Sequence, residues 1–331
     1  MTPAPPTTDR EWMARALALS LDVRATTSPN PWVGCVIVTD AGEAFEGATQ
    51  PPGGPHAEAS ALAAAGERAV GATAYVTLEP CSHHGRTPPC ADALVAAGVR
   101  RVVVALSDPD PLVAGTGLAR LRDAGVEVAE GIAFAEAAET LAPYLKHRRS
   151  GRPWVILKLA ATLDGRIAAP DGTSRWLTGE AARADAHRLR AESDAIVVGA
   201  GTVRTDDPAL TVRHVAGRDP LRVVLGEAPA SARVQPAMSM TGPLGDVLDE
   251  LGGRGILQVL VEGGARVAHD FHAAGLVDRY VLYLAPALFG GDDARAAFAG
   301  AGAASVAELW RGKLIDVRLL GDDLRVELAA A

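Results

Sequence analysis

The sequence predicts two consecutive α/β domains. With 331 residues, the chain is long enough for two domains of ordinary size. Predicted strands and helices alternate along it in two series, which are separated by a basic, glycine-containing stretch at residues 146–153. Hydrophobic residues make up 48% of the chain, which is enough for two cores. We interpret the stretch as a linker and therefore place the domains at residues 1–147 and 148–331.

The first series begins with a helix of residues 9–22, for which Asp9 is the candidate N-cap. The other elements follow from apolar or alternating runs, with Gly, Pro and Asp in the turns between them. The predicted strands are 34–39, 43–47, 74–78, 101–106 and 126–129. The further predicted helices are 56–65, 90–97, 116–124 and 134–146.

The second series starts directly after the linker and again alternates strands with helices. Its predicted strands are 154–161, 195–198, 221–225, 256–261, 279–284, 314–319 and 324–328. Its predicted helices are 180–192, 243–252 and 265–274. This half lacks the G-x-G-x-x-G pattern, so the sequence does not support an ordinary Rossmann dinucleotide site.

Charge and hydropathy exclude several classes of partner. The net charge of −8 argues against a broad nucleic-acid surface, which needs clustered Lys and Arg. A small anionic substrate remains compatible, because it needs only a few local cations. The sequence has no apolar run of the about 18 residues that span a bilayer, and its first residues do not resemble a signal peptide. We expect a cytoplasmic protein that binds neither membrane nor nucleic acid.

The most informative pattern is formed by His56, Glu58, Cys81 and Cys90. One imidazole and two thiolates are a known ligand set for catalytic zinc, which keeps a fourth position for water. The order H-x-E…P-C…C is typical of zinc-dependent deaminases, in which the Glu moves protons and is not a ligand. Zinc brings the pKa of bound water toward about 7, and a carboxylate then passes its proton to the leaving amine. The pattern therefore predicts a catalytic zinc site.

A structural zinc site is the alternative, with His83 or His84 as a fourth ligand. Glu58 argues against it, because a structural site has no use for a carboxylate at that position. Eight residues separate Cys81 from Cys90, whereas two residues are the usual spacing in zinc deaminases. A deaminase of nucleic acids should have the short spacing and a basic face, and both are absent.

The third cysteine, Cys35, lies in an apolar run at residues 33–38. This position predicts a small buried strand residue and not a metal ligand. Three cysteines in a chain of this length also exclude a disulfide framework.

Two glycine-containing turns in the second half are candidate phosphate sites. One is the stretch 199–202 and the other is the strand, turn and helix start at residues 259–265. Such turns expose backbone N–H groups at a helix N-terminus, where a phosphate can bind. Lys158, Asp164 and the segment 205–208 add polar groups at strand ends, where α/β proteins place their ligands.

Together these segments closely resemble the bifunctional riboflavin-biosynthesis deaminase/reductase family, over essentially the whole chain. The resemblance implies a cytidine-deaminase-like three-layer domain followed by a dihydrofolate-reductase-like α/β domain. The run from Cys81 to Cys90 is its most specific part. The segments that carry the resemblance are 29–34 (PNPWVG), 56–58 (HAE), 77–90 (TLEPCSHHGRTPPC), 158–166 (KLAATLDGR), 205–213 (TDDPALTVR) and 261–264 (VEGG).

The resemblance implies two consecutive reactions. The first domain would hydrolyse the amine from the ring of 2,5-diamino-6-ribosylamino-4(3H)-pyrimidinone 5′-phosphate. The second would use NADPH to reduce the ribosyl group, giving 5-amino-6-ribitylaminouracil 5′-phosphate. In the first domain it implies zinc ligands at His56, Cys81 and Cys90, a proton donor at Glu58, and substrate contacts from Asn30, His83 and Arg86. The long insert would then carry Arg86, whose planar fork suits a phosphate.

In the second domain the resemblance implies a catalytic pair, Lys158 and Asp206, nearest the reacting sugar. It implies substrate contacts from Ser174, Arg190, Leu210, Arg213 and Glu262. It implies cofactor contacts from Ala160, Trp176, Thr202, Asp206, Gly264, Ala265, Arg266, Val267, Ala268, His269 and Asp270. Simpler roles remain open, because Arg190 could be a helix-surface cation, Trp176 a packing residue, and Asp206 the cap of its turn.

Two further expectations concern cofactor and partners. Residues 226–257 form a shorter segment than in many relatives. We therefore expect the adenosine end of the cofactor to be bound by other contacts than in those relatives. We expect a small phosphorylated pyrimidine as substrate and a homo-oligomer, either dimer or tetramer. The alternative function is a deaminase whose C-terminal half serves only as an oligomerisation scaffold. A C-terminal half that had lost its activity should also have lost the polar residues at its strand ends. Lys158, Asp206, Arg213 and Glu262 are all present.

Overall fold

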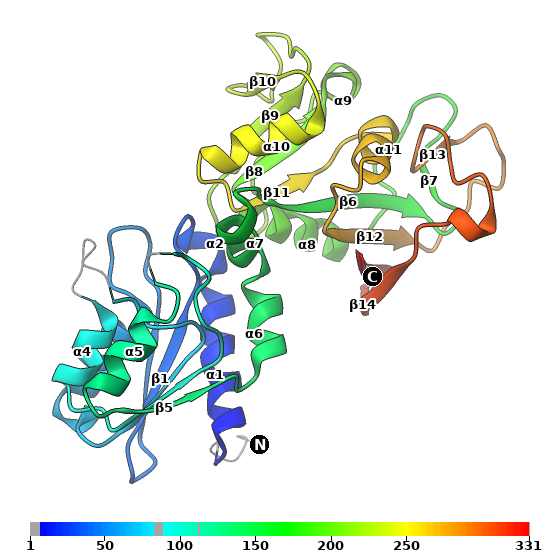
Figure 1. The fold of residues 1–331 in the computed structure, drawn as a ribbon. Coiled ribbons are helices and arrows are strands. Elements are labelled where there is room, and N and C mark those ends of the chain that lie inside the picture. Colours follow the sequence, from blue (N-terminus) through cyan, green and yellow to red (C-terminus); the bar gives the residue numbers. More distant parts are fainter. Residues whose placement is uncertain (1–6, 83–88, 112, 331) are drawn as a thin grey trace. The chain divides into compact units, whose positions relative to one another are not determined.

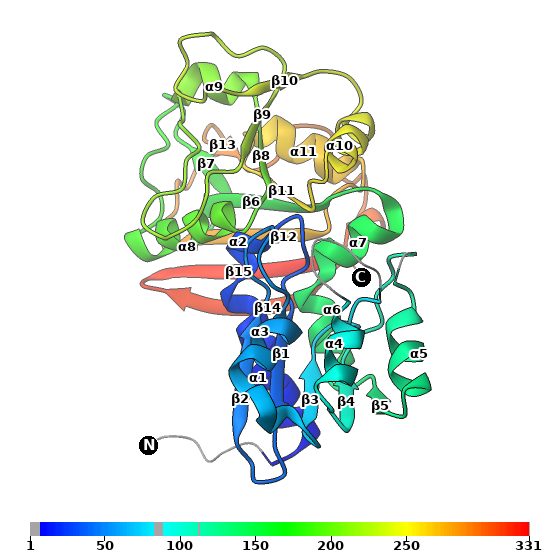
Figure 2. The same ribbon diagram turned by 90° about the vertical axis from the view of Figure 1, so that its left-hand side faces the viewer.

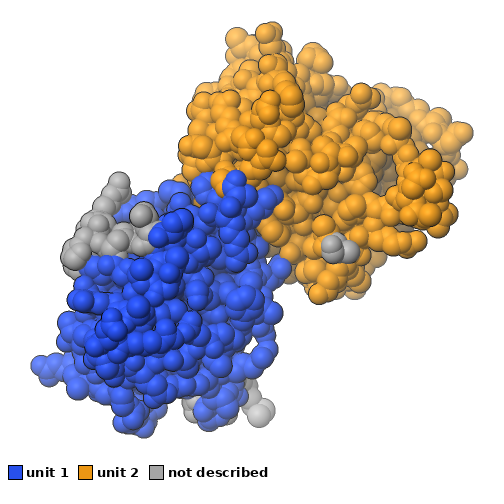
Figure 3. All heavy atoms as spheres, in the orientation of Figure 1, with its two compact units in different colours: residues 1–150 blue, residues 151–331 orange. Residues whose placement is uncertain are grey.

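The structure is a computed structural model that describes residues 7–82, 89–111 and 113–330. The chain divides into two compact units, residues 1–150 and 151–331 (Figure 3). The sequence predicts a division between the two domains after residue 147, within a linker. Instead, helix α7 (Ala142–Ser150) continues through most of that stretch, because Lys and Arg are good helix formers. Gly151, with a φ of 71°, follows the helix end.

The first unit contains a five-stranded sheet with helices on both faces (Figures 1 and 2). The strand order is β2-β1-β3-β4-β5. Strand β1 is antiparallel to β2 and β3, while β3, β4 and β5 are parallel. The strands are β1 (Gly34–Val38), β2 (Ala44–Ala48), β3 (Thr73–Val76), β4 (Arg101–Val104) and β5 (Glu127–Glu130).

Two glycines allow helices to approach opposite faces of this sheet. A Cβ on Gly34 would lie 1.9 Å from the carbonyl oxygen of Ala16 in α1, and one on Gly47 would lie 2.2 Å from that of Ala57 in α3. Gly47 pairs with Cys35, the neighbour of Gly34, so the two glycines face opposite sides. The predicted three-layer domain is confirmed. Its helices are α1 (Asp9–Asp22), α2 (Arg24–Thr27), α3 (Ala57–Ala65), η1 (Gly66–Ala69), α4 (Cys90–Ala96), α5 (Thr116–Asp123), α6 (Phe134–Thr140) and α7.

The N-cap of α1 differs from the predicted one. Thr8 is the cap: its side chain accepts from the Glu11 N–H, and the Glu11 carboxylate accepts from the Thr8 N–H at 2.9 Å. Asp9 is the first helical residue, and its carboxylate accepts two 2.8 Å hydrogen bonds from Arg101 and one from the Tyr75 hydroxyl. The prediction was wrong because Asp9 has distant partners that the local pattern cannot show.

The second unit is built on an eight-stranded sheet of order β10-β9-β8-β11-β6-β12-β15-β14. The six strands from β10 to β12 are parallel, and β15 and β14 continue the sheet in antiparallel pairing. Strands β7 and β13 form a separate small sheet. The strands are β6 (Trp154–Thr162), β7 (Arg166–Ala168), β8 (Ala195–Gly199), β9 (Leu221–Leu225), β10 (Met238–Met240), β11 (Gln258–Val261), β12 (Arg279–Ala285), β13 (Arg295–Ala296), β14 (Gly312–Leu320) and β15 (Asp323–Ala330).

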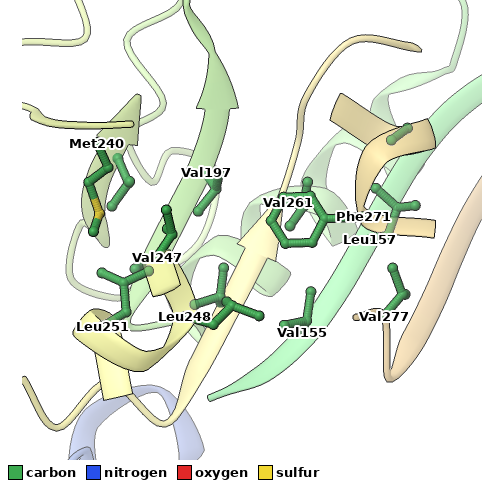
Figure 4. Close-up of a cluster of buried hydrophobic side chains, with 14 of the residues drawn as sticks. Val155, Leu157, Val197, Met240, Val247, Leu248, Leu251, Val261, Phe271 and Val277 are labelled. Atoms are coloured by element: carbon green, nitrogen blue, oxygen red, sulfur yellow. The ribbon is translucent and has the colours of Figure 1, made fainter. Parts of the chain in front are cut away.

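Two hydrophobic clusters cover the two faces of the eight-stranded sheet. On one face Val155 and Leu157 of β6 pack with Val247 and Phe271 from α10 and α11 (Figure 4). The intervening Ile156 belongs to the cluster under α8 on the other face, as the two-residue period of a strand requires. The helices are α8 (Glu180–Ala191), α9 (Ala200–Asp206), α10 (Leu244–Gly253), α11 (Ala265–Ala273) and η2 (Val306–Glu308).

Parallel pairing brings the carboxyl ends of β8, β11 and β6 to one edge of the sheet. The two glycine-containing turns follow β8 and β11 directly, and each leads into a helix. Helix α9 was not among the predicted elements, since only its first turn had been singled out. None of the helices among the described residues has both the length and the apolar character needed to cross a bilayer.

Candidate active sites

The predicted zinc ligands converge in the first unit. The Nδ1 atom of His56 lies 3.4 Å from the Sγ atom of Cys90 and 3.7 Å from that of Cys81. All three ligand atoms lie within 4.8 Å of one another. Tetrahedral zinc, with bonds of about 2.1 Å to nitrogen and 2.3 Å to sulfur, places its ligand atoms about 3.5–3.8 Å apart. The three side chains therefore fit one zinc ion.

Each ligand is held at the start or end of a regular element. His56 is the N-cap of α3, and Cys90 is the first residue of α4. Cys81 follows β3 through a short buried segment, and its Sγ accepts the backbone N–H of Cys90 at 3.4 Å. Hydrogen bonds from the Cys90 thiol and from the His56 ring lower the pKa of the Cys81 thiol. This favours the thiolate, the form that binds metal.

Glu58 lies two residues after His56, in the first turn of α3. Its side chain is buried, with the residue 4% exposed. Burial, together with the charge of Cys81, raises the pKa of Glu58 to about 7 against the opposing effect of His56. A carboxyl group with that pKa can both accept and donate a proton near neutral pH.

A second acidic residue, Glu79, supports the site and was not predicted from the sequence. Its buried carboxylate accepts the backbone N–H groups of Asp108, Gly115 and Gly117 at 3.0–3.1 Å, and that of Leu118 at 3.3 Å. A Cβ on Gly117 would lie 1.9 Å from the carbonyl oxygen of Pro80. The start of α5 is thus held directly against the segment that carries Cys81. These donors lie far along the chain, so no local pattern indicates them.

Of the three predicted substrate contacts of this domain, the structure describes only Asn30. Asn30 lies in the turn after α2, where its N–H donates to the carbonyl oxygen of Thr27 at 2.9 Å. His83 and Arg86 lie outside the described residues. Cys35 is fully buried in β1, as predicted.

The second unit contains a cavity of about 1260 Å³ at the carboxyl ends of its parallel strands. Both glycine-containing turns contribute to its wall, and the Gly264 N–H donates to the Thr202 hydroxyl at 3.2 Å. Most of the predicted reductase residues line this one cavity. They are Lys158, Ala160, Ser174, Trp176, Arg190, Thr202, Asp206, Leu210, Arg213, Glu262, Gly264, Ala265, Arg266 and Val267.

Three predicted cofactor residues do not line the cavity. Ala268 is fully buried in the core cluster under α11. Asp270 forms an ion pair at 3.3 Å with Arg266 on the same helix. His269 also lies on α11, beside Gly300. Only the first turn of α11 therefore reaches the cavity.

Glu262 is the centre of a buried ionic network at the end of β11. Its two carboxylate oxygens accept hydrogen bonds from Arg190 at 2.6 and 3.0 Å, and the Lys158 ammonium lies 3.5 Å away. Burial alone would raise the pKa of Glu262, but the charges of Arg190 and Lys158 lower it to about 2. Arg190 is therefore not a helix-surface cation, and the carboxylate that Lys158 contacts is that of Glu262.

Asp206 and Asp207 have different environments. The Asp207 carboxylate accepts the Arg233 N–H at 2.8 Å, and Asp207 ends α9 with a left-handed φ of 39°. Asp206 lines the cavity, and its carbonyl oxygen accepts a hydrogen bond from Arg175, while its carboxylate accepts none from the described residues. The residue that stabilises the turn is Asp207.

Trp176 is 68% exposed and belongs to neither hydrophobic cluster. The guanidinium of Arg183 lies 4.9 Å from the centre of its ring. Several basic residues that also line the cavity were not predicted from the sequence. They are Arg175, Arg183, Arg204, Arg233 and Arg295, together with His187 and His214.

Fold and sites together define a zinc-dependent deaminase domain joined to an α/β reductase domain. Residues 6–106 match the cytidine and deoxycytidylate deaminase zinc-binding region, and residues 153–326 match the RibD C-terminal domain. The chain belongs to the RibD family of riboflavin biosynthesis proteins. It is 42% identical over 366 residues to RibD of Escherichia coli, covering 98% of this chain and 100% of that protein. It is 43% identical over 333 residues to RibD of Mycobacterium tuberculosis, covering 97% of each.

Solved structures agree with this assignment. RibD of Acinetobacter baumannii superposes with a TM-score of 0.91 at 43% identity, covering 98% of this chain and 99% of that one. A diaminohydroxyphosphoribosylaminopyrimidine deaminase/5-amino-6-(5-phosphoribosylamino)uracil reductase from Thermotoga maritima gives 0.90 at 33% identity, with the same coverage.

The predicted function is confirmed at this level: the chain is a bifunctional deaminase and reductase of riboflavin biosynthesis. Zinc and NADPH are its cofactors. A C-terminal half that serves only as a scaffold is not favoured, because that half matches the reductase family over residues 153–326.

Proposed function

We propose that the first unit deaminates 2,5-diamino-6-ribosylamino-4(3H)-pyrimidinone 5′-phosphate and that the second reduces the ribosyl group of the product. The observation that carries this proposal is the presence of two distinct sites in one chain. One has three metal-ligating side chains beside the buried Glu58. The other is a cavity lined by nine Lys and Arg residues and two carboxylates, which suits an anionic substrate and an anionic cofactor.

In the first site, His56, Cys81 and Cys90 would hold a zinc ion, which would lower the pKa of a water molecule. Once that water has lost a proton, its oxygen can attack the ring carbon that carries the amine. Glu58 takes the proton of that water and passes it to the amine nitrogen, which leaves as ammonia. The ring carbon thereby exchanges a nitrogen for an oxygen. We assign substrate contacts to Asn30, His83 and Arg86, with the guanidinium of Arg86 on the phosphate.

In the second site, NADPH would supply a hydride to the sugar carbon that carries the ring-bound nitrogen. That carbon accepts the hydride in the open-chain imine form, and the nitrogen gains a proton. We assign the transfer of that proton to Lys158 and Asp206, which line the cavity. Glu262 pairs with the Lys158 ammonium at 3.5 Å and holds it in place.

The glycine-containing turns provide a position for a phosphate group of the cofactor in the same cavity. Gly264 is the N-cap of α11 and has no side-chain cap, so the first N–H groups of the helix face a ligand site. Thr202 contacts the same turn. We assign this position to the cofactor, with Ala160, Trp176, Ser174 and Leu210 completing the walls that hold cofactor and substrate.

The assembly and location of the chain are further proposals. Strand β14 is an edge strand whose Leu314, Val317 and Leu319 are 57%, 49% and 69% exposed. A long apolar edge strand is normally covered in solution, which supports a homo-oligomer. Cys81 and Cys90 are free thiols, and a ligand role requires reducing surroundings, which supports a cytoplasmic enzyme.

One experiment tests the proposed reactions directly. The purified zinc-loaded protein is incubated with the diaminopyrimidinone phosphate, with and without NADPH, and products are identified by mass spectrometry. Without NADPH we expect only the exchange of an amine for an oxygen, and with NADPH the further gain of two hydrogens. Deamination with no NADPH oxidation would contradict the assignment of the second unit.

A further inference from the structure

The cavity of the second unit carries more positive charge than its own carboxylates neutralise. Nine Lys and Arg residues line it, against Asp206 and Glu262, although the whole chain has a net charge of −8. Lys158 and Arg190 both pair with Glu262. Among the described residues, six cavity arginines have no carboxylate within ion-pair distance: Arg175, Arg183, Arg204, Arg213, Arg233 and Arg295.

Arg213 is a member of this group whose backbone is anchored by a neighbouring side chain. Its N–H donates to the Nδ1 atom of His187 at 2.9 Å, and its guanidinium donates to the Thr211 hydroxyl at 3.2 Å. His187 is buried on α8, and burial together with the charges of Arg190 and Arg213 lowers its pKa to about 4. The ring is therefore a neutral acceptor near pH 7 and holds the Arg213 backbone at the cavity.

Arg233 is anchored in the same way, and it belongs to the short segment 226–257. Its N–H donates to the Asp207 carboxylate at 2.8 Å. The next residue, Val234, is fully buried, and its carbonyl oxygen accepts the Nε–H of Arg222 at 3.0 Å. The backbone of Arg233 is thus held on both sides, while its side chain remains exposed and lines the cavity.

The charges of these two arginines act on each other. Burial, together with the positive charges of Arg190 and Arg233, lowers the pKa of Arg213. Both side chains line the same cavity, and like charges that share a site raise the free energy of the folded protein. A bound dianion would remove that repulsion, and two guanidinium forks can hold one phosphate through several charge-assisted hydrogen bonds.

We propose that Arg233 acts with Arg213 as the phosphate-binding pair of this cavity and holds the 5′-phosphate of the sugar substrate. The inference rests on the proposed function of the second unit. The 2′-phosphate of NADPH has the same chemistry and is the other possible source. We favour the substrate because Arg213 and Arg190 both donate to Thr211, which places Arg213 beside the network of Arg190 and Glu262, whereas the cofactor position lies at the Gly264 turn.

The test uses Arg233→Ala and Arg233→Lys in the full-length protein, with NADPH oxidation as the assay. We expect Arg233→Ala to raise the KM for the deaminated phosphate substrate about 10- to 100-fold, the usual loss for a hydrogen bond to a charged group. Arg233→Lys should recover part of the loss. The KM values for NADPH and for the dephosphorylated substrate should stay within about twofold, and ammonia release should not change.

Arg254→Ala is the matched control, because it removes an exposed arginine directly after α10 that pairs with Glu250 and does not line the cavity. An unchanged KM in Arg233→Ala would overturn the proposal, and so would an equal loss on the dephosphorylated substrate. A higher KM for NADPH alone, with NADH unaffected, would assign the pair to the cofactor. If the wild type itself fails to oxidise NADPH, the proposed function is wrong. Weaker binding of ribose 5-phosphate by Arg233→Ala would then support the pair alone, and equal binding would overturn it.

Discussion

The two sites of this chain are built at different scales. In the first unit His56, Cys81 and Cys90 bring three ligand atoms within 4.8 Å, with Glu58 two residues from one of them. In the second unit the site is a cavity of about 1260 Å³, whose walls come from the ends of separate strands and from the loops between them. One site holds an ion by direct bonds, whereas the other must hold two organic anions by many weaker contacts.

This difference determines what supports each site. The zinc ligands need fixed directions, and the segment carrying Cys81 is accordingly locked by four backbone hydrogen bonds to Glu79. The cavity needs charge spread over a larger surface, and only Glu262 among its carboxylates is tightly paired. Loss of one group should therefore be severe in the first site and graded in the second.

The largest effect is expected for Glu58→Gln. It should reduce ammonia release about 10³- to 10⁴-fold, because the proton shuttle is lost, while about one zinc per chain remains. Cys90→Ala should lose both metal and activity. Zinc content by atomic absorption and ammonia release are the measurements. A zinc-free Glu58→Gln protein would show that Glu58 is needed to hold the metal.

Lys158→Ala and Asp206→Asn should each reduce NADPH oxidation about 100-fold, the scale of a lost acid-base partner. Ammonia release should stay nearly constant in both variants, since the first unit is untouched. Asp207→Asn is the informative comparison, because Asp207 is the residue that holds the turn. If Asp206→Asn retains full reduction, the proton must come from another group.

Glu79→Ala should weaken zinc binding about 10- to 100-fold, the range found when a residue that supports metal ligands is removed. Competition with a chelator measures this affinity. Glu67→Ala, at the exposed 3₁₀ turn η1, removes the same charge and should have no effect. Unchanged zinc affinity in Glu79→Ala would mean that Cys81 is positioned without it.

The smallest effect concerns pH. The pKa of His187 lies below its ordinary value of 6.5, at about 4, because burial and nearby arginines disfavour the charged ring. The unfolded chain therefore binds a proton more readily, and stability present above pH 6.5 is lost as the pH falls toward 4. His187→Asn removes this titrating group, so the fall in Tm between pH 6.5 and pH 4 should be about 2–4 °C smaller than in the wild type. Scanning calorimetry from pH 4 to 7 measures it, and identical profiles would show that His187 does not titrate in this range.

The sequence was informative where chemistry and chain position coincide. His56, Glu58 and Cys90 lie at helix starts and Cys81 follows β3, and zinc binds few other ligand types, so the set could be predicted. Glu262 follows β11 directly, as its predicted strand end requires, whereas Lys158 lies in the middle of β6 and Asp206 at the end of helix α9. All three still line one cavity at the carboxyl ends of the parallel strands.

The groups that hold these residues could not be predicted from the sequence. Glu79 depends on donors at residues 108–118, and Asp9 binds Arg101 in β4 and not the helix end. Arg233 lies in a segment with no periodic pattern, and only the tertiary structure brings it to the cavity. The basic stretch at residues 146–153, which looks like a linker in the sequence, continues as helix α7 through Ser150.

The central claim is that each unit contains one complete and separate active site, and complementation tests it most directly. Glu58→Gln protein and Lys158→Ala protein are mixed with the diaminopyrimidinone phosphate and NADPH, and the product is identified by mass spectrometry. Alone, the first should leave the substrate unchanged and the second should stop at the deaminated compound. The mixture should form the fully reduced product. A mixture that accumulates only the deaminated compound would contradict the claim, because neither protein would then contain a working second site.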